Sequence, residues 1–381
     1  MRVVINASCL LSPLTGVGQY TLNLLQEMGK SPDLELSYFY AHRWSKELLR
    51  PARPLSPESS FGIRRRFAEL PGRSSLSRAV QQVCFSLGMP ASNAALYHEP
   101  NFLPFHFAGP VVVTVHDLSW IRHPQTHPAE RVRLMDKVFP KALPRISRLL
   151  VPSEFVRREI REVFDVPDEK IVVTLEAARA NFFPRSPEQR FCTLRRHGLT
   201  DRSFLLCVGT LEPRKNLEAA IRAHGQLPPS IRSRVPLVIV GMRGWLTSPL
   251  ERTLSGPVAK REVIPLGFVD DDALADLYSA AVCLLYPSIY EGFGLPVVEA
   301  MSCGLPVIVS NRSSLPEVGG DAAIVVEPED QATMAAAALA LIEDARAWGE
   351  RSRASTARAR DFSWQRCASE TLKAYIAAVS A

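Results

Sequence analysis

Residues 286–310 read YPSIYEGFGLPVVEAMSCGLPVIVS and hold two glutamates, Glu291 and Glu299, with seven residues between them. The apolar run 281–286 predicts a buried strand, and the glycines that follow it predict a tight turn. Pro296 suits the start of a helix, because its missing N–H costs nothing there. A helix N-terminus offers unpaired N–H groups and a partial positive charge to an anion such as a diphosphate. The stretch therefore predicts a strand, a turn, a helix and a second strand at 306–310.

Both glutamates are expected at the carboxyl end of parallel strands, where α/β proteins bind ligands. We expect Glu291 to lie on the turn, free to meet a ligand, and Glu299 to lie one turn into the helix. An anion site beside two hydrogen-bond acceptors describes a pocket for a sugar nucleotide, with phosphates on amides and hydroxyls on carboxylates. The alternative is an ordinary strand, turn and helix with two solvated glutamates.

This segment resembles the E-x7-E signature of retaining glycosyltransferases of family 4, which have the GT-B fold. The resemblance rests on residues 291–296, 299–300 and 304–307. It implies two Rossmann-like doubly wound α/β domains that face a cleft, with a C-terminal helix that crosses back to the first domain. It also implies a catalytic role for Glu291 and donor contacts by Phe293, Gly294, Leu295 and Glu299.

Length and composition fit a two-domain globular protein. The chain has 381 residues, of which 46% are hydrophobic and 22% charged, which favours a folded, soluble protein over a disordered one. No run approaches the length of a membrane-spanning helix, and residues 3–11 predict a first strand and not a signal peptide. The seven cysteines form no C-x-x-C pair, which is typical of the reducing cytosol and gives no zinc spacing. We therefore expect a cytoplasmic protein.

The net charge of +6 has a local origin. Residues 43–78 contain nine basic and three acidic residues, and prolines at 51, 54 and 57 predict a loop. The stretch is either a solvated basic loop or a surface for anionic lipid or a lipid-diphosphate acceptor. No nucleic-acid-binding module is visible. The second interpretation predicts peripheral association with the inner face of the cytoplasmic membrane.

Strands and helices alternate in both halves, which predicts two parallel sheets with helices on both faces. In the first half, strands are expected at 2–7, 34–40, 95–98, 110–116, 149–152 and 171–175, with helices at 18–29, 130–143 and 154–164. Ser153 is the expected N-cap of the last of these helices. In the second half, strands are expected at 204–208, 235–240, 263–267, 282–286, 307–310 and 323–326, with helices at 216–225, 271–280 and 332–346. An irregular connection is expected at 177–200.

The domain boundaries follow from this alternation and from the resemblance. We expect an acceptor-binding domain at 1–178, a nucleotide-sugar-binding domain at 179–362, and a helix at 363–381 that returns to the first domain.

Two glycines, Gly16 and Gly18, follow the first strand and would let a backbone approach a phosphate or sugar closely. A dinucleotide-binding site is the alternative at this position. It is disfavoured because Thr21 stands where the third glycine belongs, and because the second strand ends in Ala-His-Arg with no acid for a ribose.

His116 and Asp117 end a first-half strand at the ligand edge of the predicted sheet. His116 is a candidate to hydrogen-bond a sugar hydroxyl or the developing charge at the reaction centre. The alternative is a structural histidine satisfied by neighbouring backbone. The His-Asp pair resembles the family at this strand end, which implies a catalytic role for both residues.

Arg214 and Lys215 stand just before a second-half helix, where Arg can grip a phosphate with two hydrogen bonds and Lys supplies a point charge. The resemblance maps the diphosphate-binding cations of the family on these two residues. The plain alternative is a basic turn. Asn216 is expected to cap the helix, and a contact with the loop is the alternative.

Gly267, Phe268 and Val269 follow another second-half strand, and the resemblance puts this region against the nucleobase. Asp270 is expected to cap the helix that follows.

The family resemblance implies a retaining glycosyltransferase, and we expect it to be metal-independent. Residues 16–20, 115–118 and 212–216 resemble the mannosyl- and rhamnosyltransferase branch of the family, which implies transfer of mannose or rhamnose from a GDP-sugar to a lipid-linked or lipopolysaccharide glycan. No cofactor is expected. No Asp-x-Asp metal motif lies in a cleft position, since the contiguous aspartates 270–272 begin a helix. A UDP-sugar is the alternative donor. An epimerase, a phosphorylase (for which no pyridoxal phosphate lysine motif is present) and a non-catalytic glycan-binding partner are the other functions considered.

Overall fold

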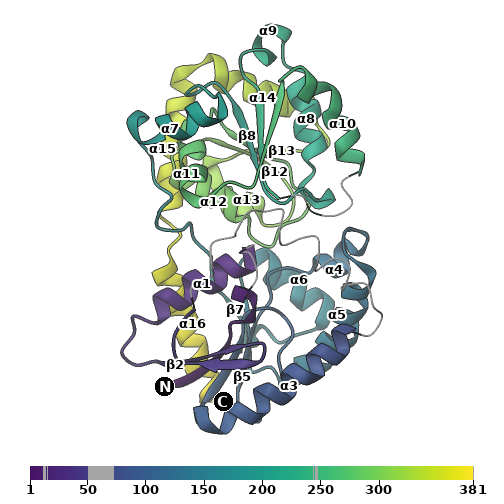
Figure 1. Ribbon diagram of the computed structural model, residues 1–381, viewed down its shortest axis with the longest axis vertical. Helices are drawn as coiled ribbons and strands as arrows, with labels where there is room; N and C mark the ends of the chain where they lie inside the picture. Colours follow the sequence, from purple (N-terminus) through teal and green to yellow (C-terminus); the bar gives the residue numbers. More distant parts are fainter. Residues whose placement is uncertain (12–13, 15, 50–72, 243, 245–247, 381) are drawn as a thin grey trace.

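The computed structural model describes residues 1–11, 14, 16–49, 73–242, 244 and 248–380. They form two lobes joined near the middle of the molecule, and both chain termini lie in the N-terminal lobe (Figure 1). Most of the basic stretch at 43–78 lies outside the described residues. Within them, no helix is long and apolar enough to cross a membrane.

The sheet of the N-terminal lobe has the order β3-β2-β1-β4-β5-β6-β7 among the described residues. Its strands pair in parallel except for β3, which pairs with β2 in antiparallel fashion. Strands buried on both faces need apolar side chains at successive positions, and Val3, Val4 and Ile5 are fully buried. The strand bounds are β1 Arg2–Asn6, β2 Glu35–Tyr40, β3 Arg43–Ser45, β4 Leu96–Glu99, β5 Val111–Thr114, β6 Arg148–Val151 and β7 Ile171–Val173.

The C-terminal lobe repeats this design with a parallel sheet of order β10-β9-β8-β11-β12-β13 among the described residues. Strand order reverses beside β8 in this sheet and beside β1 in the other, which is where doubly wound sheets bind ligands. The strand bounds are β8 Leu205–Val208, β9 Leu237–Val240, β10 Val263–Gly267, β11 Leu284–Tyr286, β12 Val307–Ser310 and β13 Ile324–Val326.

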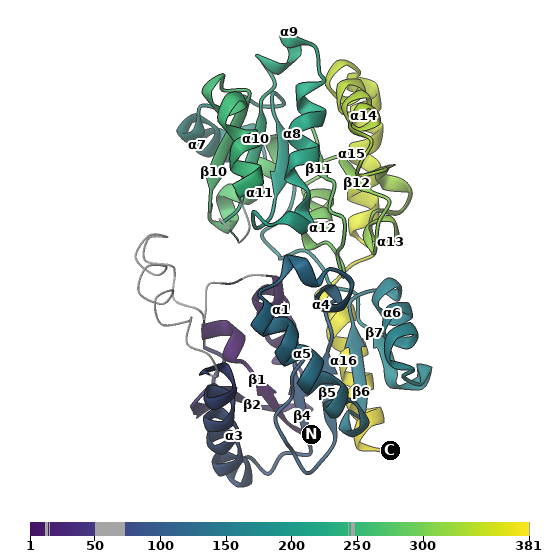
Figure 2. The ribbon, with the colours of Figure 1, turned by 90° about the vertical axis from the view of Figure 1, so that its right-hand side faces the viewer.

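Helices cover both sheets, as the alternation predicts (Figures 1 and 2). The N-terminal lobe has α1 Gly16–Met28, α3 Arg73–Ser92, α4 Ser119–Arg122, α5 Ala129–Ala142 and α6 Glu154–Phe164. The C-terminal lobe has α7 Pro187–His197, α8 Leu217–Gly225, α9 Pro229–Arg232, α10 Ser248–Ala259, α11 Asp271–Ala280, α12 Leu295–Ser302, α13 Leu315–Gly319, α14 Gln331–Glu343 and α15 Ala345–Ala359.

The last helix, α16 (Trp364–Val379), leaves the C-terminal lobe and packs against α1 and strands β4 to β7 of the other lobe (Figure 1). Ser363 caps it by accepting the N–H of Arg366. The hydroxyl of Tyr375 lies 2.7 Å from Nδ1 of the buried His98 on β4. The predicted fold class of two doubly wound domains with a returning C-terminal helix is confirmed.

Three local predictions differ from the structure. The connection 177–200 is not irregular throughout, because Ser186 and Gln189 form a capping box that starts α7. The helix expected at 332–346 ends at Glu343, because Asp344 accepts the N–H groups of Arg346 and Ala347 and starts α15. Helix α3 begins at Arg73, at the end of the basic stretch, where no helix was predicted.

Candidate active site

The stretch that decides the fold forms β11, a turn at 287–294, α12 and β12, as predicted. Gly294 caps α12 in a left-handed conformation with φ of 103°, which favours glycine. A Cβ at this position would also lie 2.8 Å from Cδ2 of Leu315. Pro296 stands in the first turn of α12, as predicted.

Glu291 is buried in this turn, which corrects the expectation that it is free. One carboxylate oxygen accepts hydrogen bonds from Lys215 Nζ at 2.6 Å and from the Tyr286 hydroxyl at 2.9 Å. The other accepts from Arg214 Nη1 at 3.3 Å. Its side chain is only 8% exposed. A ligand hydroxyl must therefore share or displace these contacts.

The ion pairs decide the charge state of the site. Burial alone would raise the pKa of Glu291, but the charges of Lys215 and Arg214 outweigh burial, and the pKa is lowered. Burial would lower the pKa of Arg214, yet Glu291, Asp117 and Glu212 raise it above its ordinary value. Glu291 and Arg214 are thus both charged near neutral pH.

Arg214 links this turn to the N-terminal lobe. It donates to Glu212 at 2.9 Å and to the Tyr290 carbonyl at 2.8 Å, and it lies 3.7 Å from the carboxylate of Asp117. Asp117 also accepts from the amide and hydroxyl of Ser119. The predicted cations and Asp117 therefore gather at one place although they come from different lobes.

Gly292 shows how closely the lobes meet. A Cβ on this residue would lie 1.7 Å from the carbonyl oxygen of His116, so a side chain cannot fit. The Gly292 carbonyl accepts a hydrogen bond from the buried Ser153 hydroxyl of the N-terminal lobe at 2.6 Å. The turn that carries Glu291 is thus in direct contact with the strand end that carries His116 and Asp117.

His116 already has partners within the chain. Its Nε2 lies 2.9 Å from the Pro100 carbonyl, and its Nδ1 lies 3.4 Å from the Glu176 carboxylate. The ring packs edge-on against Tyr20 with centroids 4.8 Å apart. This geometry favours the structural alternative for His116, and its catalytic role stays a prediction.

Glu299 lies on α12 as expected but faces the connection between the lobes. It accepts hydrogen bonds from Nη2 of Arg179 at 2.9 Å and from the Tyr278 hydroxyl at 3.3 Å. Arg179 also pairs with Asp271 and stacks over the Phe182 ring at 4.4 Å. A donor that binds Glu299 must compete with Arg179, so its role in donor binding also stays a prediction.

The glycines expected to contact the donor differ in their surroundings. Gly16 begins α1 with open space around it, whereas a Cβ on Gly18 would lie 2.8 Å from the Leu14 side chain. Packing thus accounts for Gly18 without a ligand. Gly267 ends β10 at φ of 68°, where a Cβ would meet no atom of the described residues within 4 Å, and Phe268 beside it is 44% exposed. Contact of Gly267, Phe268 and Val269 with a nucleobase stays a prediction.

Asp270 and Asn216, two of the residues expected to cap helices, each directly precede the predicted helix. Asp270 caps α11 by accepting the N–H of Ala273 at 2.9 Å, as predicted. Asn216 precedes α8 in a left-handed conformation without a side-chain cap, so that prediction is wrong. Its amide instead donates to the carbonyls of Pro287 and Pro328, and thereby holds the turn before Glu291.

Sequence reasoning missed several residues that hold the site: Tyr286, Tyr290, Glu212, Arg179, Glu176 and Ser314. The Ser314 hydroxyl donates to the carbonyls of both Glu291 and Phe293 at 2.9 Å. Tyr286 and Tyr290 lie in the quoted stretch, and Glu212 lies two residues before Arg214, so proximity in sequence was an available signal. Arg179, Glu176 and Ser314 come from other segments and gave none.

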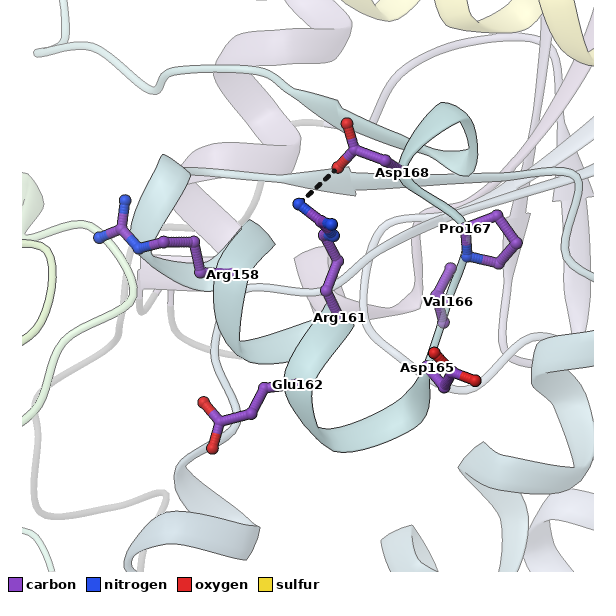
Figure 3. A pocket seen from close by; sticks show the side chains of 7 residues that line it. All are labelled: Arg158, Arg161, Glu162, Asp165, Val166, Pro167 and Asp168. Atoms are coloured by element: carbon purple, nitrogen blue, oxygen red, sulfur yellow. Dashed lines mark ion pairs between the residues drawn. The ribbon is translucent and has the colours of Figure 1, made fainter.

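A surface hollow on α6 and the loop after it lies outside this site (Figure 3). Its lining includes Arg161 and Asp168, which form an ion pair at 3.4 Å, and Asp168 also pairs with Arg157. The paired charges satisfy one another, and nothing in this hollow points to a ligand.

Family models match both halves of the chain. The family model described as "Glycosyltransferase Family 4" matches residues 14–174, and the one described as "Glycosyl transferases group 1" matches residues 193–361. The chain is 35% identical to O-antigen chain mannosyltransferase B of Escherichia coli over 386 residues, which cover 98% of this chain and 99% of that protein. It is 30% identical over 224 residues to O-antigen chain mannosyltransferase RfbU of Salmonella typhimurium, covering 58% of this chain and 57% of that protein.

Solved structures share the fold over the whole chain. Sucrose-phosphate synthase from Thermosynechococcus elongatus superposes with a TM-score of 0.75 at 20% identity and 98% coverage of both chains. WaaG, a glycosyltransferase involved in lipopolysaccharide biosynthesis, superposes with a TM-score of 0.72 at 16% identity and 99% coverage of both chains. The chain therefore belongs to the glycosyltransferases of family 4 and has their GT-B fold.

Proposed function

We propose that the protein is a retaining hexosyltransferase that moves mannose or rhamnose from a GDP-sugar to a lipid-linked or lipopolysaccharide glycan. The observation that carries the proposal is the buried cluster of Arg214, Lys215 and Glu291, within reach of Asp117 at the junction of the lobes. Two cations that lie between the C-terminal lobe, proposed to bind the donor, and the N-terminal lobe, proposed to bind the acceptor, suit a diphosphate leaving group.

The two cations of the cluster are proposed to act directly in bond cleavage, and in the free protein three carboxylates neutralise them. Arg214 and Lys215 carry two positive charges, and Asp117, Glu212 and Glu291 carry three negative ones, so the formal sum is −1 (2 − 3). A bound diphosphate takes over contacts that the carboxylates make in the free protein. As the sugar departs, charge builds on the diphosphate, and both cations and the N-terminus of α12 stabilise it.

Metal independence follows from the same chemistry, because positive side chains can do for a diphosphate what Mg²⁺ does elsewhere. Retention is proposed from the family resemblance, through a front-face attack in which the leaving phosphate takes the proton of the acceptor hydroxyl. In this scheme Glu291 binds a hydroxyl of the donor sugar.

The proposed sugar and the proposed nucleobase are supported by different observations. Two relatives are named mannosyltransferases of the O-antigen chain, which supports mannose and a surface glycan. No side chain near Gly267 to Val269 reads guanine by itself, and backbone carbonyls there are the proposed readers. A UDP-sugar is the alternative donor.

The acceptor is proposed to bind the N-terminal lobe of a cytoplasmic enzyme associated with an anionic membrane through residues 43–78. Of this stretch, residues 50–72 lie outside the described part. Arg78 donates to the carbonyls of Leu103 and Pro104, so it is turned toward its own lobe. Vesicle flotation tests the proposal: binding at low salt should fade at high salt, and salt-independent binding or none would reject it.

A transfer assay tests the function. The protein is incubated with labelled GDP-mannose, GDP-rhamnose or a UDP-hexose and a lipid-linked glycan, and the anomeric configuration of the product is read by NMR. We expect transfer from a GDP-sugar with retention. Thermal stabilisation should rank GDP above UDP and ADP, and ligand at ~100 times its dissociation constant adds about 2.7 kcal/mol. Transfer from UDP-sugars alone would overturn the donor. Nucleotide binding without turnover on any acceptor would favour a non-catalytic partner.

A further inference from the structure

Tyr290 belongs to the turn of Glu291 but extends its side chain into the other lobe. Its carbonyl accepts a hydrogen bond from Arg214 at 2.8 Å, so its backbone is part of the cation cluster. Its hydroxyl oxygen accepts the backbone N–H of Leu118 at 2.9 Å and donates its proton to the Glu159 carboxylate. One side chain thus joins the donor-side turn to the residue that follows Asp117.

The surroundings hold this hydroxyl in place. Tyr290 is 4% exposed and Glu159 is 6% exposed. The phenol ring packs against His123 and Phe155, with centroids 5.1 and 5.8 Å away. Glu159 also accepts from Arg122 Nε at 2.9 Å. Amide, phenol, carboxylate and guanidinium form one chain of hydrogen bonds, and such chains strengthen each member in a low-dielectric interior.

The contact fixes a distance that matters for transfer. Leu118 directly follows Asp117, whose carboxylate lies 3.7 Å from Arg214. Without the hydroxyl, the amide of Leu118 loses its partner, and the segment 117–118 can move away from the cations. The ring would still fill the space between α4 and α6.

We propose that Tyr290 is a positioning residue for glycosyl transfer, whose hydroxyl holds segment 117–118 of the N-terminal lobe against the Arg214 and Lys215 cluster. It thereby sets the spacing between donor and acceptor. The proposal rests on the assignment of that cluster to the donor diphosphate. The hydroxyl points away from Lys215 and Glu291 into the N-terminal lobe, so it acts on geometry and not on diphosphate binding.

Tyr290→Phe keeps the ring and removes the hydroxyl. We expect kcat to fall about tenfold, which corresponds to about 1.4 kcal/mol, because the Leu118 amide and the Glu159 carboxylate each lose a buried hydrogen-bond partner. The dissociation constant of GDP should stay within about twofold of the wild-type value, since the cations are untouched. Hydrogen exchange of the Leu118 amide should accelerate. A global loss of stability would instead accelerate exchange at many amides, so a change confined to Leu118 reports on this contact.

Tyr375→Phe is the matched control. Its hydroxyl is equally buried and bonds His98 at 2.7 Å, but it joins α16 to the sheet of the N-terminal lobe and not to the cluster. It should lower the melting temperature and leave kcat and Leu118 exchange unchanged. Glu159→Leu should lower kcat in the wild-type background and have little further effect on kcat in the Tyr290→Phe background, because both changes break the same contact.

Unchanged kcat and unchanged Leu118 exchange in Tyr290→Phe would overturn the proposal. A loss of GDP affinity as large as the loss of kcat would also overturn it, because Tyr290 would then act on the donor site itself. If the wild-type protein binds neither GDP nor UDP, the donor-site assignment fails instead, and the exchange of Leu118 still decides whether the contact holds the lobes.

Discussion

Glu291→Gln separates transition-state stabilisation from binding of the leaving group. The substitution keeps the size of the side chain and one acceptor oxygen but removes the charge that pairs with Lys215 at 2.6 Å and Arg214 at 3.3 Å. The fold should survive, because Lys215 keeps the Tyr286 hydroxyl at 2.8 Å and Arg214 keeps Glu212 at 2.9 Å.

Two effects of opposite sign follow from the geometry. A hydrogen bond from a sugar hydroxyl to a carboxylate is worth about 1.5–3 kcal/mol, so turnover should fall by roughly ten- to a hundredfold. Like charges about 5 Å apart repel by about 3 kcal/mol at an effective dielectric constant of about 20. Removing the carboxylate therefore relieves repulsion of a diphosphate held by Lys215, and the affinity for GDP should stay equal or rise.

The assay pairs steady-state turnover with calorimetric titration of GDP. Glu262→Gln is the control, because it removes a partly buried ion pair with Arg232 at 3.2 Å elsewhere in the same lobe. That control should leave both quantities unchanged. Near wild-type turnover in Glu291→Gln would refute the role of the carboxylate, and a parallel loss of GDP affinity would refute its separation from the diphosphate.

Three further predictions follow from the same structure. Lys215→Ala should weaken GDP and donor alike by about tenfold or more, the loss of one charge-assisted hydrogen bond, and unchanged affinity in the titration would reject the position of the diphosphate. EDTA should leave turnover intact, and activity lost to EDTA and restored by Mg²⁺ or Mn²⁺ would contradict metal independence. Burial lowers the pKa of His98 to about 3, so the native ring stays neutral while the unfolded ring gains a proton below about pH 6.5. This contribution to stability is complete above about pH 6.5 and falls with pH, by about 2 kcal/mol at about pH 5; urea unfolding should show a flatter pH dependence for His98→Gln, and an equal slope would contradict the buried neutral ring.

The sequence predicted most of the architecture because the signals are local. Alternating apolar strands and amphipathic helices define both sheets, and Ser153 and Asp270 cap the helices that they were expected to cap. Helix α7 was missed because the prolines of the stretch 177–200 were interpreted as marks of an irregular connection, although a proline right after Ser186 is also a helix-start signal. Asn216 is the opposite error: a residue expected to cap a helix donates a hydrogen bond to the Pro287 carbonyl in a distant turn instead.

The sequence predicted which residues form the candidate site but not which residues they contact. The motif locates Glu291 on a turn, but its burial depends on Lys215, which is 76 residues earlier in the chain. Asp117 reaches Arg214 only because the two lobes meet. Arg179 on Glu299 is likewise a contact between distant segments. Pairings of this kind depend on how the lobes pack, and a local pattern carries no information about that.

The most direct test of the account is a crystal structure of the wild-type protein with GDP. We predict that the β-phosphate contacts the guanidinium of Arg214 and the ammonium of Lys215 between the lobes, that the start of α12 faces the diphosphate, and that guanine lies beside Gly267 to Val269. A diphosphate held elsewhere, such as at the glycines that begin α1, with Arg214 and Lys215 still paired only to Glu291, would contradict the account.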